Sequence, residues 1–347
     1  KVSPHYPVDK WLFWVYARIW VWTLFFVSAC FVSGHALLRI VLPTGLNLRA
    51  RAVYSMAAGV LVFFAGVFGA GLLGLLSRHF ALLWPAALCV VGAPALIRRL
   101  PRIERHVRAA RRRAGPTPWW TWPLYGYGVL ALGAIYFSIL SPQNVAFDAH
   151  FYHLGLAQEY AVQGAISRSA EGWICAAIPH LASVLYTWAL LVPGFPNAER
   201  VLLAGHLEFA LFVATLASLV VLVRWLVPRA RAGLSWVVFF LFPGIFLYDS
   251  SLTTAADHIA AFWAPAIYLA LGQAWRGLEP RRCAVLAMVL GGALLTKYQS
   301  VQLAILPVLA VTVRALWLLG LGLWSRRSAR ALVVLSAASC SSPRPTG

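Results

Sequence analysis

The chain of 347 residues is 61% hydrophobic and only 11% charged, which excludes a water-soluble protein. Basic residues outnumber acidic ones by 29 to 10, for a formal charge of +19. They fall in short gaps between apolar blocks rather than on one soluble segment, which argues against a nucleic-acid partner. The five cysteines are widely spaced and form neither a disulfide framework nor a metal-binding pattern. The composition predicts an all-α polytopic membrane protein.

Apolar stretches recur along the chain and predict a bundle of about nine membrane spans. Residues 179–193 are apolar but short and are flanked by prolines, so we expect a helix on the membrane surface there. The expected spans cover residues 11–33, 52–76, 80–97, 119–141, 200–226, 233–250, 251–275, 283–297 and 299–321.

The gaps between the expected spans carry a one-sided charge. With the first residues outside, twenty Lys and Arg fall in inside gaps and six in outside gaps. This distribution follows the positive-inside rule, provided that 179–193 does not cross. The eight arginines between Arg98 and Arg113 are then a topology anchor on anionic lipid. The prediction places the polar stretch 142–178 on the outer face of the cytoplasmic membrane.

Asp148 lies in this outer loop, six residues before a helical pattern of apolar side chains that predicts a surface helix over 154–166. It stands beside His150, Tyr152 and His153. Such a cluster can take a proton from a nucleophile, or it can bind a divalent cation through Asp148 and His150. The alternative is that Asp148 only caps the surface helix.

Two further ionisable residues are expected near the outer face. Asp257 falls about two turns into the expected span 251–275, where a carboxylate is unfavourable unless it faces water or a partner. Lys297 ends a short span, where it can reach the interface or meet a phosphate. Deeper in the bundle, His206 and Glu208 are expected to form a neutral pair that hydrogen-bonds between helices, and a role in catalysis is the alternative.

The order of several short patterns resembles the GT-C superfamily of integral-membrane glycosyltransferases, in the group of protein O-mannosyltransferase-like and aminoarabinose-transferase-like enzymes. The resemblance covers about residues 119–321. Its patterns are Asp-Ala-x-x-Tyr-His-Leu (148–154) with a later Gly-Ala-Ile (164–166), a proline-flanked apolar segment (179–193), Glu-Arg (199–200), Phe-Pro followed by Ala-Ala-Asp (242–257), and Leu-Thr-Lys-Tyr (295–298).

The resemblance implies an inverting transfer of a sugar from a polyprenyl-phosphate donor to a lipid, glycan or protein acceptor. It assigns the general base to Asp148, a supporting place in the same cavity to Asp257, and contact with the carrier phosphate to Lys297. It also divides the chain into an N-terminal three-span segment with a basic loop (1–118), a GT-C-like catalytic core (119–321) and a truncated C-terminal segment (322–347). The other candidate substrate-binding residues are His150, Tyr152, His153, His258 and Tyr298.

The chain departs from that family's pattern in three ways. Ala149 stands where many relatives carry a second acid, the first three spans are not part of the family core, and a large C-terminal outside domain is missing. Because the chain begins with Lys1 and its last apolar run is short, we expect a truncated copy. Two alternatives stay open: a transporter or flippase of a lipid-linked or anionic substrate, with Asp148, Asp257 and Glu208 as a relay, and an inactive membrane fragment.

Overall fold

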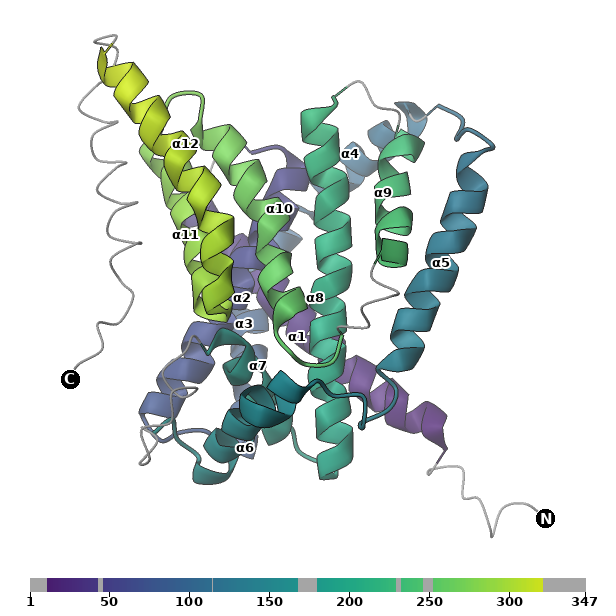
Figure 1. Ribbon diagram of the computed structural model, residues 1–347, viewed down its shortest axis with the longest axis vertical. Helices are drawn as coiled ribbons and strands as arrows, with labels where there is room; N and C mark the ends of the chain where they lie inside the picture. Colours follow the sequence, from purple (N-terminus) through teal and green to yellow (C-terminus); the bar gives the residue numbers. More distant parts are fainter. Residues whose placement is uncertain are drawn as a thin grey trace.

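The computed structural model describes residues 11–42, 46–113, 115–167, 180–228, 232–245 and 252–320, and within these ranges helices joined by turns and loops are the only regular secondary structure. The all-α prediction is therefore confirmed. Figure 1 shows most of the helices side by side in one bundle, with α6 lying across one end. The helices are α1 (Leu12–Val41), α2 (Leu48–Leu72), α3 (Arg78–Ile97), α4 (Leu100–Arg113), α5 (Thr121–Ser138), the π-helix η2 (Ala149–His153), α6 (Leu154–Gln163), α7 (Leu181–Leu191), α8 (Asn197–Leu226), α9 (Ala232–Ile245), α10 (Asp257–Ala274), α11 (Pro280–Thr296), the 3-10 helix η4 (Tyr298–Ser300) and α12 (Val301–Gly320).

In the described part of the chain, five helical segments are long and apolar enough to cross a membrane, as a membrane protein requires. They are α1, α2, α3, α8 and the continuous segment Tyr298–Gly320. Four other expected spans are helical but fall below that length or apolarity. Helices α9 and α11 have 14 and 17 residues, and α5 and α10 have 18 residues each, with Trp, Tyr, Pro or polar end residues that lower their hydropathy.

The first two helices pack through glycines. A Cβ on Gly59 of α2 would overlap the Cys30 carbonyl of α1, and one on Gly34 of α1 would overlap the Ser55 carbonyl of α2. Small residues at such contacts let two helix backbones approach closely in a bilayer. The buried core that begins here continues through α7, α8, α10 and α11, so the first helices and the later ones share one core.

Helix α7 is buried in the bundle, which corrects the expectation of a membrane-surface helix over 179–193. Ten of its eleven residues are buried, against α2, α3, α6, α8 and α11. Trp188 is fully buried and donates from Nε1 to the Ala81 carbonyl at 2.9 Å. A helix that is apolar all round has no polar face to turn to water or headgroups, so protein covers it. At eleven residues α7 is also too short to cross.

The loop after α5 carries the expected helix, as η2 followed by α6. One face of α6 is buried through Leu154, Leu156, Ala157 and Tyr160, and Gly164 ends the helix with a left-handed backbone (φ 69°). Residues 168–179 of the loop lie outside the described ranges. The helical periodicity read from the sequence therefore identified α6 and its buried face.

Basic residues gather at the end of the bundle opposite α6. Figure 1 shows the strongly basic α4 at the same end as the C-terminal ends of α8 and α10 and the start of α11. Arg224 lies in the last turn of α8, Arg276 follows α10, and Arg282 lies in the first turn of α11. The one-sided charge of the sequence is thus a one-sided charge of the folded bundle.

Candidate functional site

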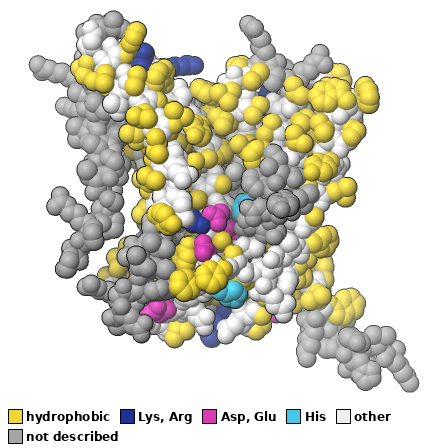
Figure 2. Space-filling model, viewed as in Figure 1, with side chains coloured by type: hydrophobic (Ala, Val, Ile, Leu, Met, Phe, Trp, Pro, Cys, Tyr) yellow, Lys and Arg dark blue, Asp and Glu magenta, His cyan; other side chains and the backbone are white. Residues whose placement is uncertain are grey.

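Lys297 brings the two candidate aspartates together. Its Nζ lies 2.8 Å from Oδ1 of Asp257 and 3.8 Å from Oδ2 of Asp148. The lysine side chain is only 7% exposed, whereas the carboxylates of Asp148 and Asp257 are 46% and 54% exposed. A cation shielded by protein therefore faces two carboxylates that stay open to their surroundings. On the face drawn in Figure 2, basic, acidic and histidine side chains lie next to one another beside a broad hydrophobic area.

The end of α11 positions the lysine. The helix stops at Thr296, and Lys297 takes up an extended backbone (φ −155°, ψ 140°) before the chain turns through η4 into α12. Thr296 accepts a hydrogen bond from Nε1 of Trp263 on α10 at 2.9 Å, and Gly292 leaves room for that indole ring. This contact fixes the end of α11 against α10, so the lysine and Asp257 start from adjoining helix ends.

Asp257 is the first residue of α10, so the expectation that it lies two turns inside a span is wrong. Ala256 precedes it in the left-handed region (φ 67°), as does Thr254 (φ 61°). These two non-glycine residues turn the chain sharply enough to start the helix at the carboxylate. A carboxylate at a helix N-terminus is stabilised by the unpaired backbone N–H groups there, which removes the penalty of a mid-span position.

Glu208 supports this turn, and the sequence did not reveal that role. Its Oε2 accepts a hydrogen bond from the backbone N–H of Thr254 at 2.7 Å, and the side chain is fully buried in α8. The expected pair of Glu208 with His206 is wrong, because residues two apart point to different faces of a helix. His206 instead donates from Nδ1 to the Leu202 carbonyl at 2.7 Å and lies 3.4 Å from the Tyr136 hydroxyl.

On the other side of the lysine, Asp148 is held by η2. The Tyr152 hydroxyl, one helical turn onward, donates to Oδ2 of Asp148 at 3.3 Å. The Asp148 carboxylate makes no helix-capping hydrogen bond, so the capping alternative does not describe this side chain. Tyr152 is buried and His150 is exposed. Asp148 is thereby oriented by a phenol beneath it and paired with the lysine beside it.

His153 ties the loop to the core. Its Nδ1 lies 3.1 Å from the Ser183 hydroxyl of α7, and the residue is buried. Burial, together with the positive charge of Lys297 and the nearby His180, lowers the pKa of His153 to about 3. The imidazole is therefore neutral at ordinary pH, and it joins the loop to α7 as a hydrogen-bonding group.

The remaining candidates divide between surface and interior. Tyr298 is 58% exposed in η4, immediately after the lysine. His258 is buried, with its ring 5.1 Å from the Phe212 ring in an edge-to-face contact. Of the expected substrate-binding residues, His150 and Tyr298 are thus accessible, whereas Tyr152, His153 and His258 lie within the protein.

No protein-family model, curated protein or solved structure matches this chain. What the site can do therefore follows from its own groups. The ammonium group of a lysine can neutralise an anion, and a half-exposed carboxylate beside it can accept a proton. Both groups adjoin apolar helices.

A metal site is the other chemistry expected of Asp148 and His150. In the part of the chain that the structure describes, no group of three or more His, Cys, Asp and Glu side chains is arranged around a common point. Ca²⁺ and Mg²⁺ each take six or more ligands, mostly oxygen, so either ion bound at Asp148 and His150 would draw most of its ligands from water or substrate. Lys297 already provides a positive charge at Asp148.

Proposed function

We propose that the chain is a membrane glycosyltransferase of the GT-C type, which transfers a sugar with inversion from a polyprenyl-phosphate carrier to a hydroxyl of a lipid, glycan or protein. The observation that carries the proposal is the placement of Lys297 between Asp148 and Asp257, where apolar helices end. The order of the GT-C-like patterns along the sequence supports it, because three of those patterns each supply one of these residues.

The proposed reaction needs a base for the acceptor and a cation for the leaving group. The acceptor hydroxyl attacks the anomeric carbon and gives its proton to the carboxylate of Asp148. The bond from that carbon to the phosphate oxygen breaks, and the polyprenyl phosphate leaves with the electron pair. Lys297 stabilises the negative charge that develops on the phosphate. Asp257 holds the lysine in place through the 2.8 Å hydrogen bond.

The proposal places this chemistry on the outer face of the cytoplasmic membrane. Support comes from the positive-inside rule, since the basic α4 lies at the end of the bundle opposite α6 (Figure 1). It also assigns α5, α9, α10 and α11 to the membrane, which brings the number of spans to about nine. Their shorter apolar lengths are compatible with crossing where neighbouring helices, rather than lipid, cover their polar residues.

The positions of the acids favour surface chemistry over a transport relay. A relay needs ionisable groups distributed across the thickness of the membrane. Glu208 instead hydrogen-bonds Thr254, three residues before Asp257, and Asp257 shares Lys297 with Asp148. The three acids of the relay alternative therefore gather around one turn of the chain.

The test is turnover of the carrier by the purified protein in lipid nanodiscs. A panel of polyprenyl-phosphate hexoses and pentoses is incubated with membrane-lipid acceptors, and released polyprenyl phosphate is measured by mass spectrometry. Asp148→Asn should reduce release by about 100-fold or more, as expected for loss of a general base. Glu159→Gln is the matched control, because that acid lies on α6 and hydrogen-bonds Gln163 instead of Lys297. Release that needs no Asp148, or no release from any donor, would count against the proposal.

A further inference from the structure

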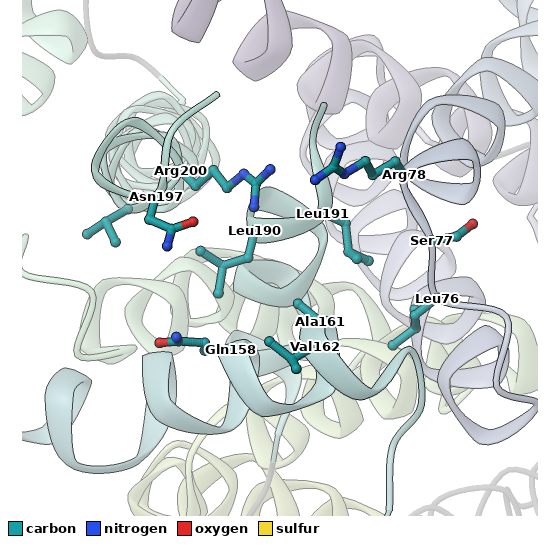
Figure 3. A pocket seen from close by; sticks show the side chains of 11 residues that line it. Leu76, Ser77, Arg78, Gln158, Ala161, Val162, Leu190, Leu191, Asn197 and Arg200 are labelled. Atoms are coloured by element: carbon teal, nitrogen blue, oxygen red, sulfur yellow. The ribbon is translucent and has the colours of Figure 1, made fainter. Parts of the chain in front are cut away.

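A cavity with polar walls lies apart from the Lys297 cluster. It has a volume of about 380 Å³ and opens between the start of α3, α6, the end of α7 and the start of α8. None of the residues that line it belongs to the Lys297 cluster. Figure 3 shows its polar side chains projecting from α3, α6 and α8.

Two arginines dominate the charge of this cavity. Arg78 of α3 and Arg200 of α8 both line it, and no lining residue is acidic. Figure 3 shows their guanidinium groups directed toward one another across the opening. Two like charges that face each other repel, and an anion between them would turn that repulsion into two attractions.

Neither arginine has its charge matched in the described part of the chain. No carboxylate there pairs with Arg78 or Arg200, and the Nε of Arg200 is buried without a hydrogen-bond partner. Glu199, the neighbour of Arg200, is engaged by Arg18 of α1 at 3.2 Å. An unsatisfied buried donor on a cation is unfavourable, which points to a ligand that accepts hydrogen bonds and carries negative charge.

Two helix ends add to this preference for an anion. Helix α3 begins at Arg78 after the N-cap Ser77, and α8 begins at Asn197, and all three residues line the cavity. The N-terminus of a helix presents free N–H groups and a partial positive charge. The other walls are largely apolar, with Leu76, Leu190, Leu191 and Val201 among them.

We propose that this cavity binds a phosphate ester, held between Arg78 and Arg200, in the headgroup of an anionic membrane lipid. Arginine suits this ligand because its planar fork matches two phosphate oxygens. The apolar walls and the apolar helices on which the arginines sit favour a lipid over a free ion. This binding does not depend on the proposed transfer reaction.

The test measures how tightly the purified full chain binds three probes. They are vesicles of phosphatidylglycerol, vesicles of phosphatidylcholine, and inorganic phosphate. Arg78→Gln and Arg200→Gln should each weaken binding of phosphatidylglycerol by about 10-fold, the effect of losing one charged hydrogen bond. The double variant should lose less affinity than the product of the two single-variant losses, because one anion contacts both arginines. Arg314→Gln is the control, since that residue lies on α12, away from the cavity, and donates to the backbone carbonyls of Trp275 and Arg276. Arg78→Lys and Arg200→Lys should retain part of the affinity.

Stability provides an independent measurement. Without anion, Arg200→Gln should have a melting temperature no lower than that of the unsubstituted chain, because repulsion from Arg78 is relieved. A lower melting temperature would mean that the arginines are structural, and it would overturn the proposal. Equal binding by Arg78→Gln, Arg200→Gln and the unsubstituted chain would also overturn it. Binding of inorganic phosphate that depends on both arginines, without preference for phosphatidylglycerol, would overturn the lipid source. Asp148→Asn should leave this binding unchanged, which separates it from the transfer site.

Discussion

Lys297→Met removes the cation of the cluster while keeping an unbranched, apolar stem. The variant leaves Asp148 and Asp257 facing each other without a counter-charge and leaves the Ala255 carbonyl without its donor. Because both carboxylates are about half exposed, water takes over much of the solvation that the lysine provided. We expect the free energy of unfolding to fall by about 2 kcal/mol, less than for a fully buried pair.

The two carboxylates should contribute unequally to that loss. Coulomb energy varies inversely with distance, so the 2.8 Å pair with Asp257 is about 1.4 times as strong as the 3.8 Å pair with Asp148. Only Asp257 also accepts a hydrogen bond from the lysine. We therefore expect a coupling of about 2 kcal/mol between Lys297 and Asp257, and of less than about 1 kcal/mol between Lys297 and Asp148.

Double-mutant cycles measure these couplings. Lys297→Met is combined in turn with Asp257→Asn and Asp148→Asn, and unfolding is followed by circular dichroism in mixed micelles of increasing denaturing detergent. The control cycle uses Arg18→Met and Glu199→Gln, an ion pair of 3.2 Å whose arginine is 52% exposed, and should give less than about 1 kcal/mol. A larger coupling for Asp148 than for Asp257, or a coupling for Asp257 no greater than the control, would refute the geometry of the cluster.

Three further predictions concern the surroundings of the site. The pKa of His153 is lowered to about 3 from an unfolded value of about 6.5, so the stabilisation by the neutral imidazole is complete above pH 6.5 and is lost as pH falls. Between pH 7.5 and 5, the free energy of unfolding should therefore drop by about 2 kcal/mol more in the unsubstituted chain than in His153→Gln. Equal drops would contradict this. Gly59→Ala should destabilise by about 1–3 kcal/mol and lower the yield of monodisperse protein, whereas Gly69→Ala, with open space at its Cβ, should not; equal effects would exclude the close helix contact. Glu208→Leu should cost about 2 kcal/mol because it leaves the Thr254 N–H unpaired, and Glu208→Gln, which keeps an acceptor, should cost clearly less in the same unfolding assay.

The sequence predicted which residues form the site better than it predicted the local backbone geometry around them. The apolar run that ends in Thr-Lys-Tyr predicted that Lys297 ends a helix, and α11 ends one residue earlier, at Thr296. The start of α10 was placed too early, because Thr254 and Ala256 adopt left-handed backbones without a glycine to signal them. Such a turn depends on tertiary support, here the carboxylate of Glu208, which lies 46 residues away from Thr254 in the sequence.

Helix α7 shows a second limit of sequence patterns. An apolar segment of eleven residues has the same composition whether lipid headgroups or protein surround it. Proline flanks and length argued against a span for this segment, but only the neighbouring helices determine that Trp188 is covered by protein. Arg78 and Arg200 likewise could not be paired from the sequence, because they lie far apart in it. The starts of α3 and α8 bring them to one cavity.

The unequal ion pairs also bear on the order of events in the proposed reaction. A carrier phosphate that approaches Lys297 competes with both carboxylates for its three N–H donors. The weaker partner is released first, and that partner is Asp148 at 3.8 Å, while the 2.8 Å hydrogen bond keeps the lysine on Asp257. Phosphate binding would thus free Asp148 as the base at the moment that its leaving group is in place. Asp257→Asn should accordingly impair transfer, because the lysine would remain with Asp148. The effect should appear in kcat more than in the KM for the carrier. An effect on KM alone would contradict this order.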